Sequence, residues 1–444
     1  MIKAVLALSV VVGCVGAAMH PPDGSTFSAR APILLGIAWV AFAVAVWTLP
    51  KARVVPLVLG GAVALQLAAG FAPPRSSDDM YRYVWDGRIQ ASGTDPYRYP
   101  PSSPRLREHR DPDFLWAPDG RWCVPDGCTH INRPDVPTIY PPVAEAYFTV
   151  VHWLSPPRSR TGPIQLAAAL CALASTVLLL FAPGLSRRFA AAWAWCPAVA
   201  VEAANNAHVE FLAVLLTATA ILLVARGRAW GGGAVLGLAI ATKFSPALVA
   251  PALARRRPVA VGISALAAVA VVYAPHVALV GPKVLGYLPG YLQEEGYAGG
   301  GRFALLTTVL PDAWAAPVAV AVLAAVALWV LRTTDPDRPW AAATVMVGSA
   351  LLVTAPGYPW YATLLVLLAA AGGRVEWLGV AVAGSLVLYA NDLGITPLLA
   401  QRLGYGLALA AVVTVAVLRS RSRLGDAAAA LSPGSTTQER QRAS

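Results

Sequence analysis

Charged residues are scarce in this chain of 444 residues. Only 13% of its residues are Asp, Glu, Lys or Arg, whereas 57% are hydrophobic. A soluble domain carries about a quarter charged residues, so this chain has too few to cover a water-exposed surface. The composition therefore excludes a soluble enzyme, a disordered protein, a coiled coil and a disulfide scaffold, and it predicts a polytopic membrane protein.

Lysine is rarer still, and nearly all of the 34 basic residues are arginines. The net charge of +11 is typical of a membrane protein with basic cytoplasmic loops. No compact basic segment with interleaved aromatic residues is present, so we expect no nucleic-acid partner.

Long apolar runs recur along the chain. A membrane-spanning helix needs about 20 apolar residues, and its backbone hydrogen bonds must close within the segment. The first run also resembles a signal peptide, but a polytopic chain needs no separate signal. The candidate spans are 4–19, 31–49, 54–72, 163–182, 189–203, 208–225, 259–276, 313–331, 340–355, 359–372, 375–390 and 403–418.

The apolar segment 229–254 is too long for one span and too short for two. Basic residues bracket it, namely Arg228 and Arg255. We therefore predict a hairpin of short helices with Lys243 at its apex, in which Ser245 caps the second helix. A lysine beside a helix N-terminus is suited to a phosphate group, although a lysine that only reaches toward the membrane surface remains the alternative.

The arginines predict the orientation. The basic clusters all fall on one side of the membrane if the N-terminus is cytoplasmic, and segment 73–162 then lies on the opposite side. This count requires 143–155 to be an interfacial helix rather than a span. We predict an all-α integral membrane protein with about 13 or 14 transmembrane helices and one extracytoplasmic helical loop domain. Residues 1–53 form an additional N-terminal hairpin, 54–418 the main domain, and 419–444 a disordered cytoplasmic tail.

Segment 73–142 is the sizeable aqueous part of the chain. It contains 10 of the 23 acidic residues and several aromatic residues, which together suit a carbohydrate or a polar lipid headgroup. Two of the five cysteines, Cys123 and Cys128, flank a Val-Pro-Asp-Gly turn in this segment. We expect them to form a disulfide, because a zinc site would lack its other two ligands.

The segment begins with a predicted helix near Asp78, where span 54–72 leaves the membrane. Ser77 is a candidate cap, and Asp78 and Asp79 complement the helix dipole. Four side chains recur at i, i+3, i+4 and i+7 and so share one helix face: Asp79, Arg82, Tyr83 and Asp86. This face places carboxylates at the headgroup plane; a solvated cap that only anchors the loop is the alternative.

An ordered set of motifs runs along the chain. It comprises Asp78-Asp79-Met80-Tyr81-Arg82-Tyr83-Val84-Trp85-Asp86-Gly87-Arg88, Thr138-Ile139-Tyr140-Pro141-Pro142, Ala194-Trp195-Cys196-Pro197, Glu202-Ala203-Ala204-Asn205-Asn206-Ala207-His208-Val209-Glu210, Ala241-Thr242-Lys243 and Gly357-Tyr358-Pro359-Trp360-Tyr361. This set resembles the actinobacterial polyprenyl-phosphomannose-dependent alpha-mannosyltransferases of the GT-C glycosyltransferase superfamily. Many of those proteins have Asp where this chain has Glu210, and two N-terminal spans are additional here.

The resemblance implies an inverting transfer of mannose from a polyprenyl phosphate to a glycolipid or lipoglycan acceptor, outside a bacterial plasma membrane, with both termini cytoplasmic. The chain independently favours a membrane-borne donor, because no cytoplasmic loop is long enough for a nucleotide-binding fold. Such a reaction needs a carboxylate base and cations for the leaving phosphate. Asp79 is the first candidate base and Asp78 the second.

Further residues receive expected roles. The candidates for donor phosphate binding are Lys243, Arg302 and Arg82. The candidates for sugar or acceptor binding are Tyr83, Asp86, Asn206, His208, Glu210 and Trp360. The glycine-rich loop before Arg302 is expected to close over the donor, and a solvated loop is the alternative.

Two other functions fit the same sequence. One is the same fold with a glucosyl or arabinosyl donor, and the other is a flippase or transporter of polyprenyl lipids that uses its carboxylates for proton coupling. No cofactor is required by the sequence. Asp78 and Asp79 are able to hold a divalent cation, so a metal requirement is left open.

Overall fold

The computed structural model describes residues 1–21, 30–297 and 300–431 of the chain. These residues form helices joined by short connections, together with one two-stranded hairpin. The all-α fold class predicted from composition is therefore confirmed.

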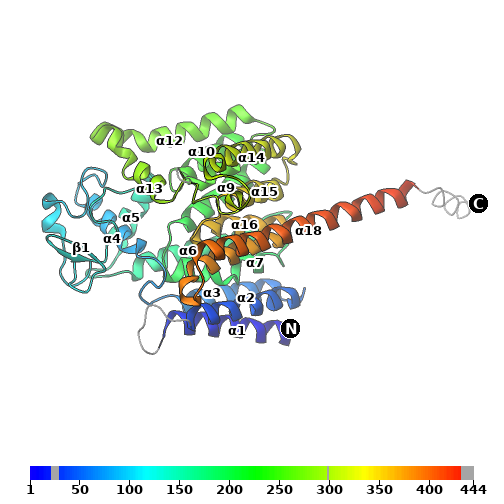
Figure 1. Cartoon of the computed structure of the whole chain (residues 1–444), viewed down its shortest axis with the longest axis horizontal. Coiled ribbons are helices and arrows are strands. Elements are labelled where there is room, and N and C mark those ends of the chain that lie inside the picture. Colours follow the sequence, from blue (N-terminus) through cyan, green and yellow to red (C-terminus); the bar gives the residue numbers. More distant parts are fainter. Residues whose placement is uncertain (22–29, 298–299, 432–444) are drawn as a thin grey trace, which may run out of the picture.

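The helices of the N-terminal part pack side by side. They are α1 (Ile2–Met19), α2 (Arg30–Thr48) and α3 (Val54–Ala69). Helices α1 and α2 form an antiparallel pair, and α1 also packs on α3, so the additional hairpin is joined to the rest of the bundle (Figure 1).

The loop domain follows α3. Its elements are α4 (Asp79–Ala91), η1 (Pro104–His109), β1 (Trp122–Val124), β2 (Gly127–Thr129) and α5 (Pro142–Leu154). Helices α4 and α5 pack closely because residue 87 is glycine: a Cβ there would lie 2.4 Å from the Phe148 carbonyl oxygen. Helix α5 has 13 residues, too few for an independent span.

The remaining elements form the bundle. In chain order they are α6 (Gly162–Phe181), α7 (Ala190–Ala194), α8 (Pro197–Ala200), η2 (Val201–Asn205), α9 (Glu210–Ala225), α10 (Ala229–Ile240), η3 (Ser245–Val249), α11 (Ala250–Leu253), α12 (Pro258–Val280), η4 (Gly281–Leu285), α13 (Leu288–Glu294), η5 (Leu306–Thr308), α14 (Asp312–Thr333), α15 (Trp340–Thr354), η6 (Pro359–Ala362), α16 (Thr363–Gly372), η7 (Val375–Trp377), α17 (Leu378–Leu388), η8 (Asn391–Leu393) and α18 (Pro397–Leu431).

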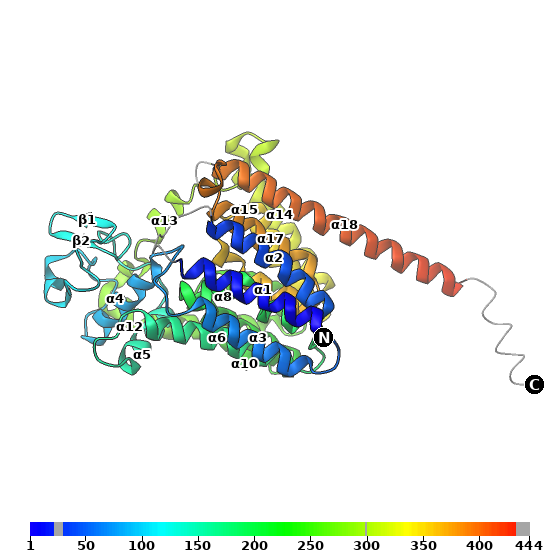
Figure 2. The same ribbon diagram turned by 90° about the horizontal axis from the view of Figure 1, so that it is seen from below.

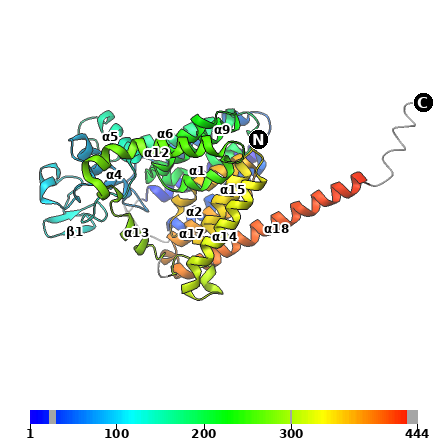
Figure 3. The same cartoon turned by 90° about the horizontal axis from the view of Figure 1, so that it is seen from above.

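Three views place the loop domain at one end of the bundle, whereas the N-terminus and the far end of α18 lie toward the other (Figure 1, Figure 2 and Figure 3). Large apolar side chains are exposed on the outer faces of the helices, including Leu67, Leu266 and Val320. Such faces suit lipid rather than water. Both observations agree with a bundle that crosses a membrane and carries its loop domain on one side.

Within the described residues, six helices are long and apolar enough to cross a membrane, and a bent pair makes a possible seventh. Five further apolar helices have only 10–17 residues. The expected 13 or 14 spans are thus not all full-length helices. Three of the shorter helices, α3, α15 and α17, fall on predicted spans. Each of these helices ends before the apolar run of the sequence does.

Two predicted segments differ in the structure. The span expected at 189–203 is broken into α7, α8 and the π-helix η2, because Pro197 forces Cys196 into an extended conformation. The tail expected to be disordered from residue 419 continues α18 to Leu431, where a run of alanines favours helix. The rest of that predicted tail, 432–444, lies outside the described residues.

Candidate active site

A cavity of about 590 Å³ lies between the loop domain and the bundle. Its lining comes from α4 and the hairpin on one side, and from α15, η6 and the turn after α10 on the other. The lining includes six of the predicted catalytic and binding residues: Asp78, Asp79, Arg82, Lys243, Arg302 and Trp360. Segments separated by almost 300 residues therefore meet in one site.

Asp79 is the first residue of α4. Its backbone N–H donates to the Ser77 hydroxyl at 3.2 Å, but the cap position is Asp78 and carries no side-chain cap bond, so the expected Ser77 cap is wrong. Asn132 donates to one carboxylate oxygen of Asp79 at 2.6 Å, and His208 Nδ1 lies 3.9 Å from the other. The Asp79 side chain is 18% exposed, so it is held by protein groups and still reaches the cavity.

Asp78 has different partners. Arg121 Nη1 lies 3.2 Å from its carboxylate, and the indole N–H of Trp122 donates to the same oxygen at 3.4 Å. Burial raises the pKa of the Asp78 carboxyl, and the Arg121 charge offsets this only in part. The Asp78 carboxylate is thus held by two residues at the start of the β1–β2 hairpin. This favours Asp79 over Asp78 as the candidate general base.

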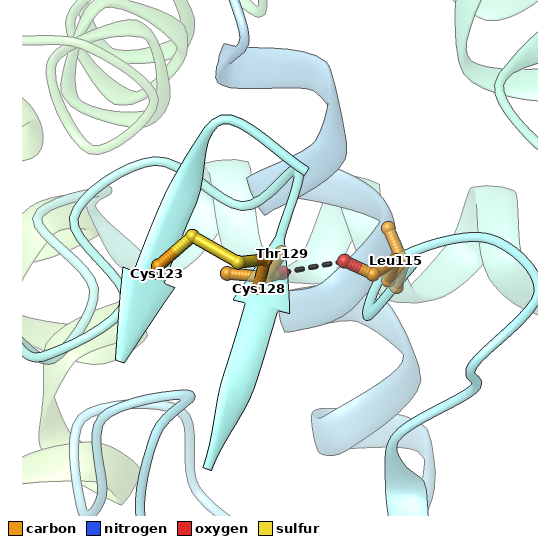
Figure 4. The surroundings of a disulfide bond; sticks show 4 residues. All are labelled: Leu115, Cys123, Cys128 and Thr129. Carbon is orange, nitrogen blue, oxygen red and sulfur yellow. Dashed lines mark hydrogen bonds between the residues drawn. A yellow bond between two sulfur atoms is a disulfide. The ribbon is translucent and has the colours of Figure 1, made fainter. Parts of the chain in front are cut away.

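The hairpin itself carries the disulfide. Cys123 and Cys128 are opposite each other on β1 and β2 and are bonded through their sulfur atoms (Figure 4). The hydroxyl of Thr129 donates to the Leu115 carbonyl oxygen, which fixes β2 against the preceding loop (Figure 4). Because Arg121 and Trp122 enter the cavity lining directly before Cys123, the disulfide stabilises that part of the wall.

Lys243 lies in the turn between α10 and η3, which is the apex position predicted for the hairpin of short helices at 229–254. Its ammonium is 2.8 Å from Glu210 Oε1 and 5.2 Å from the centre of the Tyr140 ring. The predicted Ser245 cap is wrong: Phe244 occupies the cap position and no side chain bonds there. The following element is a 3-10 helix of only five residues, so phosphate binding here would depend on the lysine charge.

Arg302 is paired with Glu295 and lies over the rings of Tyr297 and Tyr361, at 5.3 and 5.4 Å from their centres. Its side chain is 7% exposed and lines the cavity. Residues 298 and 299 of the glycine-rich loop lie outside the described residues, and closure of this loop stays a prediction.

Arg82 is paired with Asp86. The Nε of Arg82 lies 3.0 Å from each of the two Asp86 carboxylate oxygens. Arg82 also donates to the Val136 carbonyl oxygen at 3.1 Å and thereby holds that loop segment against α4. Tyr83 is fully buried and stacks on Phe148 with 4.4 Å between ring centres. Neither Tyr83 nor Asp86 belongs to the cavity lining, because Tyr83 packs against Phe148 of α5 and Asp86 is paired with Arg82. We therefore assign them no sugar contact.

Three other predicted sugar contacts are also buried. Asn206, His208 and Glu210 are at most 4% exposed and do not line the cavity. The Trp360 ring lies between His208 and the cavity: it stacks on the His208 ring at 4.2 Å and is itself part of the lining. Trp360 is therefore the one member of this predicted group that is placed to touch a substrate.

Asn132 and Glu202 are among the residues of the site for which the sequence predicted no role. Asn132 belongs to an irregular loop with no periodic pattern, and only the fold brings it to Asp79. Glu202 lies on a predicted span, where an acidic residue is unusual and is itself a functional signal. Its carboxylate is 3.2 Å from His208 Nε2.

Within the described residues, no three His, Cys, Asp or Glu side chains are grouped as a metal site requires. A divalent cation on Asp78 and Asp79 would need further oxygen ligands from a substrate phosphate.

The fold and the site define an all-α membrane protein with a largely apolar cavity, which also carries charged side chains, between its bundle and one loop domain. Residues 138–356 match glycosyltransferase family 87. This match supports a glycosyltransferase, and together with the apolar helices it supports a lipid-linked sugar donor. Neither the curated proteins nor the solved structures gave a match. The matched region contains Lys243 and Arg302, whereas Asp79 precedes it.

Proposed function

We propose that this protein is an inverting glycosyltransferase that moves mannose from a polyprenyl phosphate to a glycolipid or lipoglycan acceptor. The observation that carries the proposal is one cavity whose lining includes the Asp79 carboxylate, the cationic side chains of Lys243 and Arg302, and an apolar wall. These are the groups that such a transfer needs: a base, a stabiliser of the leaving phosphate and a dry surface for the lipid.

The proposed reaction uses these groups in a single displacement step. Asp79 accepts the proton of an acceptor hydroxyl while that oxygen attacks the anomeric carbon of the donor. A new C–O bond forms, the bond from the anomeric carbon to the phosphate oxygen breaks, and the phosphate keeps the electron pair. Lys243 and Arg302 stabilise the charge that develops on the phosphate. Attack opposite the leaving group inverts the anomeric centre, so a beta-linked donor yields an alpha product.

The apolar part of the cavity is suited to the polyprenyl chain. Leu248, Leu323 and Leu351 line it on the bundle side, and Leu288 and Leu292 on the side of α13. The polar groups Asp78, Asp79 and Trp122 lie on the side of the loop domain. This separation favours an acceptor that approaches from the loop domain and a donor that approaches from the bundle.

We further propose that the loop domain faces away from the cytoplasm of a bacterial cell and that both termini are cytoplasmic. The arginine distribution supports this orientation, as does a disulfide within the loop domain, since disulfides persist in oxidising compartments. A cavity on that side has no access to nucleotide sugars, which makes a membrane-borne donor necessary.

The test is transfer from radiolabelled polyprenyl-phosphate mannose in proteoliposomes that contain membrane lipid acceptors. Asp79→Asn is expected to lower kcat by about 100-fold or more, as loss of a general base does, while donor binding is retained. Asp119→Asn is the matched control, because Asp119 is in the same domain but its side chain is 82% exposed. Full activity of the Asp79 variant would exclude it as the base.

The same assay separates the alternatives. A glucosyl or arabinosyl enzyme would transfer label only from the corresponding polyprenyl phosphate. A flippase would move the intact labelled lipid between leaflets and form no new glycosidic bond. Mass spectrometry of the product gives the sugar, the acceptor and the linkage.

A further inference from the structure

The segment between η2 and α9 has an unusual backbone. Val201–Asn205 is a π-helix, Ala207 has a positive φ of 55°, and the chain turns by 120° before α9 continues. π-Helices and non-glycine residues in the left-handed region are uncommon and are concentrated at functional sites. Its residues are completely or almost completely buried.

This segment holds the start of α4 in place. Asn205 donates to the Pro73 carbonyl oxygen at 3.1 Å and accepts from the Arg75 N–H at 3.0 Å. Asn206 donates to the Ser76 hydroxyl at 2.6 Å. The backbone that leads to Asp79 is therefore bonded to the same turn that carries His208.

His208 is completely buried among three carboxylates. Its Nε2 lies 3.2 Å from Glu202, and its Nδ1 lies 3.8 Å from Glu210 and 3.9 Å from Asp79. Glu202 is oriented in turn by Asn206, which donates to its carboxylate at 3.0 Å. The imidazole of His208 therefore lies between a buried glutamate and the candidate base.

Packing alone does not account for this arrangement. Burying charged groups is costly unless they are paired, and apolar side chains of similar size would fill the same space at least as favourably. Glu210 has a separate partner in Lys243, at 2.8 Å. His208 Nδ1 lies between Glu210 and Asp79, and its Nε2 faces Glu202, so the imidazole connects Glu202 to Asp79.

We propose that Glu202 and His208 are positioning residues for Asp79. Glu202 fixes the orientation of the imidazole. The imidazole lies beside one oxygen of the Asp79 carboxylate while Asn132 donates to the other, and together they keep this carboxylate directed into the cavity. Trp360 shields the imidazole from the cavity. The proposal rests on the proposed function, because it assigns these residues to the base of the transfer reaction.

Other groups also act on the Asp79 carboxylate, so they must be kept constant in any test. The charged ones are Asp78, Arg133, Glu210 and Lys243. The neutral titratable ones are Tyr83, Tyr140, Tyr291 and Tyr358.

The test compares kcat and the donor KM of the wild-type protein with those of His208→Asn and Glu202→Gln. Residues that orient a reactive group typically contribute about 10- to 100-fold, so we expect kcat to fall by about that factor while KM for the donor changes less than about twofold.

Two controls distinguish positioning from a general loss of structure. His109→Gln alters another histidine of the chain, whose near contact is the exposed Glu108, and it is expected to leave both quantities unchanged. In an Asp79→Asn background, His208→Asn is expected to cause less than about a twofold further loss, because the group through which it acts is already gone.

An unchanged kcat in both variants, or an equal loss with and without Asp79, would overturn the proposal. If His208→Asn does not fold, Glu202→Gln carries the same test, since it keeps the shape of the side chain. Absence of transfer by the wild-type protein would instead contradict the proposed function, which separates the two failures.

Discussion

Lys243 is the residue whose charge the proposed reaction uses most directly. Its ammonium faces Glu210 at 2.8 Å and lines the cavity, so the glutamate orients it without removing it from the site. We expect Lys243→Ala to lower kcat/KM for a polyprenyl-phosphate donor by about 100-fold, the effect of removing one preorganised group that stabilises developing charge.

The measurement is steady-state transfer at several donor concentrations, with Lys283→Ala as the control. Lys283 is exposed and lies in η4, away from the cavity lining, so its loss is expected to leave kcat/KM unchanged. Equal rates for the two variants would mean that Lys243 serves only to neutralise Glu210.

Single residues of the site differ in how far the sequence reveals them. Asp79 and Lys243 were predictable because each is a charged residue where an apolar run ends or turns. Tyr83 and Asp86 share a helix face with Asp79, but periodicity cannot show that this face packs on another helix. Asn132 lies in an irregular loop, and its hydrogen bond to Asp79 depends on the tertiary fold alone.

At the scale of elements, the contact between α4 and α5 contains a buried acidic pair. Glu145 on α5 is completely buried and accepts a hydrogen bond from Thr138 at 2.7 Å, while Asp86 on α4 is paired with Arg82. Burial raises the pKa of the Glu145 carboxyl well above its usual value, and the nearby Asp86 charge raises it further. Burial likewise raises the pKa of Asp86, although Arg82 opposes this.

The sign of the resulting pH dependence follows from the direction of the Glu145 shift. In the unfolded chain Glu145 loses its proton near pH ~4.3, whereas in the folded protein it keeps that proton to higher pH. Folding therefore favours the protonated form, and the free energy of unfolding falls as pH rises from about 4.3 through the raised pKa. Each unit by which the pKa of Glu145 is higher in the folded protein than in the unfolded chain corresponds to about 1.4 kcal/mol of unfolding free energy.

We expect Glu145→Gln to remove this dependence. Its unfolding midpoint in detergent should be close to that of the wild type at pH ~4 and should exceed it increasingly up to neutral pH. Glu108→Gln is the control, because the Glu108 side chain is 80% exposed and should give no such divergence. If the difference in unfolding midpoint between Glu145→Gln and the wild type does not grow with pH, Glu145 is ionised in the folded protein.

The bounds of the helices agree closely with the predicted bounds where the apolar runs of the sequence are long and uninterrupted. Predicted spans 4–19 and 163–182 correspond to α1 and α6 within two residues at each end. The π-helix η2 and the turn at Ala207 could not be predicted in this way, because hydropathy reports burial in lipid and not the geometry of the backbone. These irregular elements are the ones that carry His208 to Asp79.

For the whole molecule, the remaining prediction concerns the orientation in the membrane. The loop domain and the N-terminus lie toward opposite ends of the bundle, so a reagent on one side should reach only one of them (Figure 1). We expect a membrane-impermeant maleimide to label Glu108→Cys in intact cells and to label Lys51→Cys only after permeabilisation. Both positions are exposed, and the native free cysteines Cys14, Cys171 and Cys196 are partly or fully buried, which keeps the background low. Labelling of Glu108→Cys only after permeabilisation would place the cavity on the side of the nucleotide sugars, and a polyprenyl phosphate donor would then no longer be required.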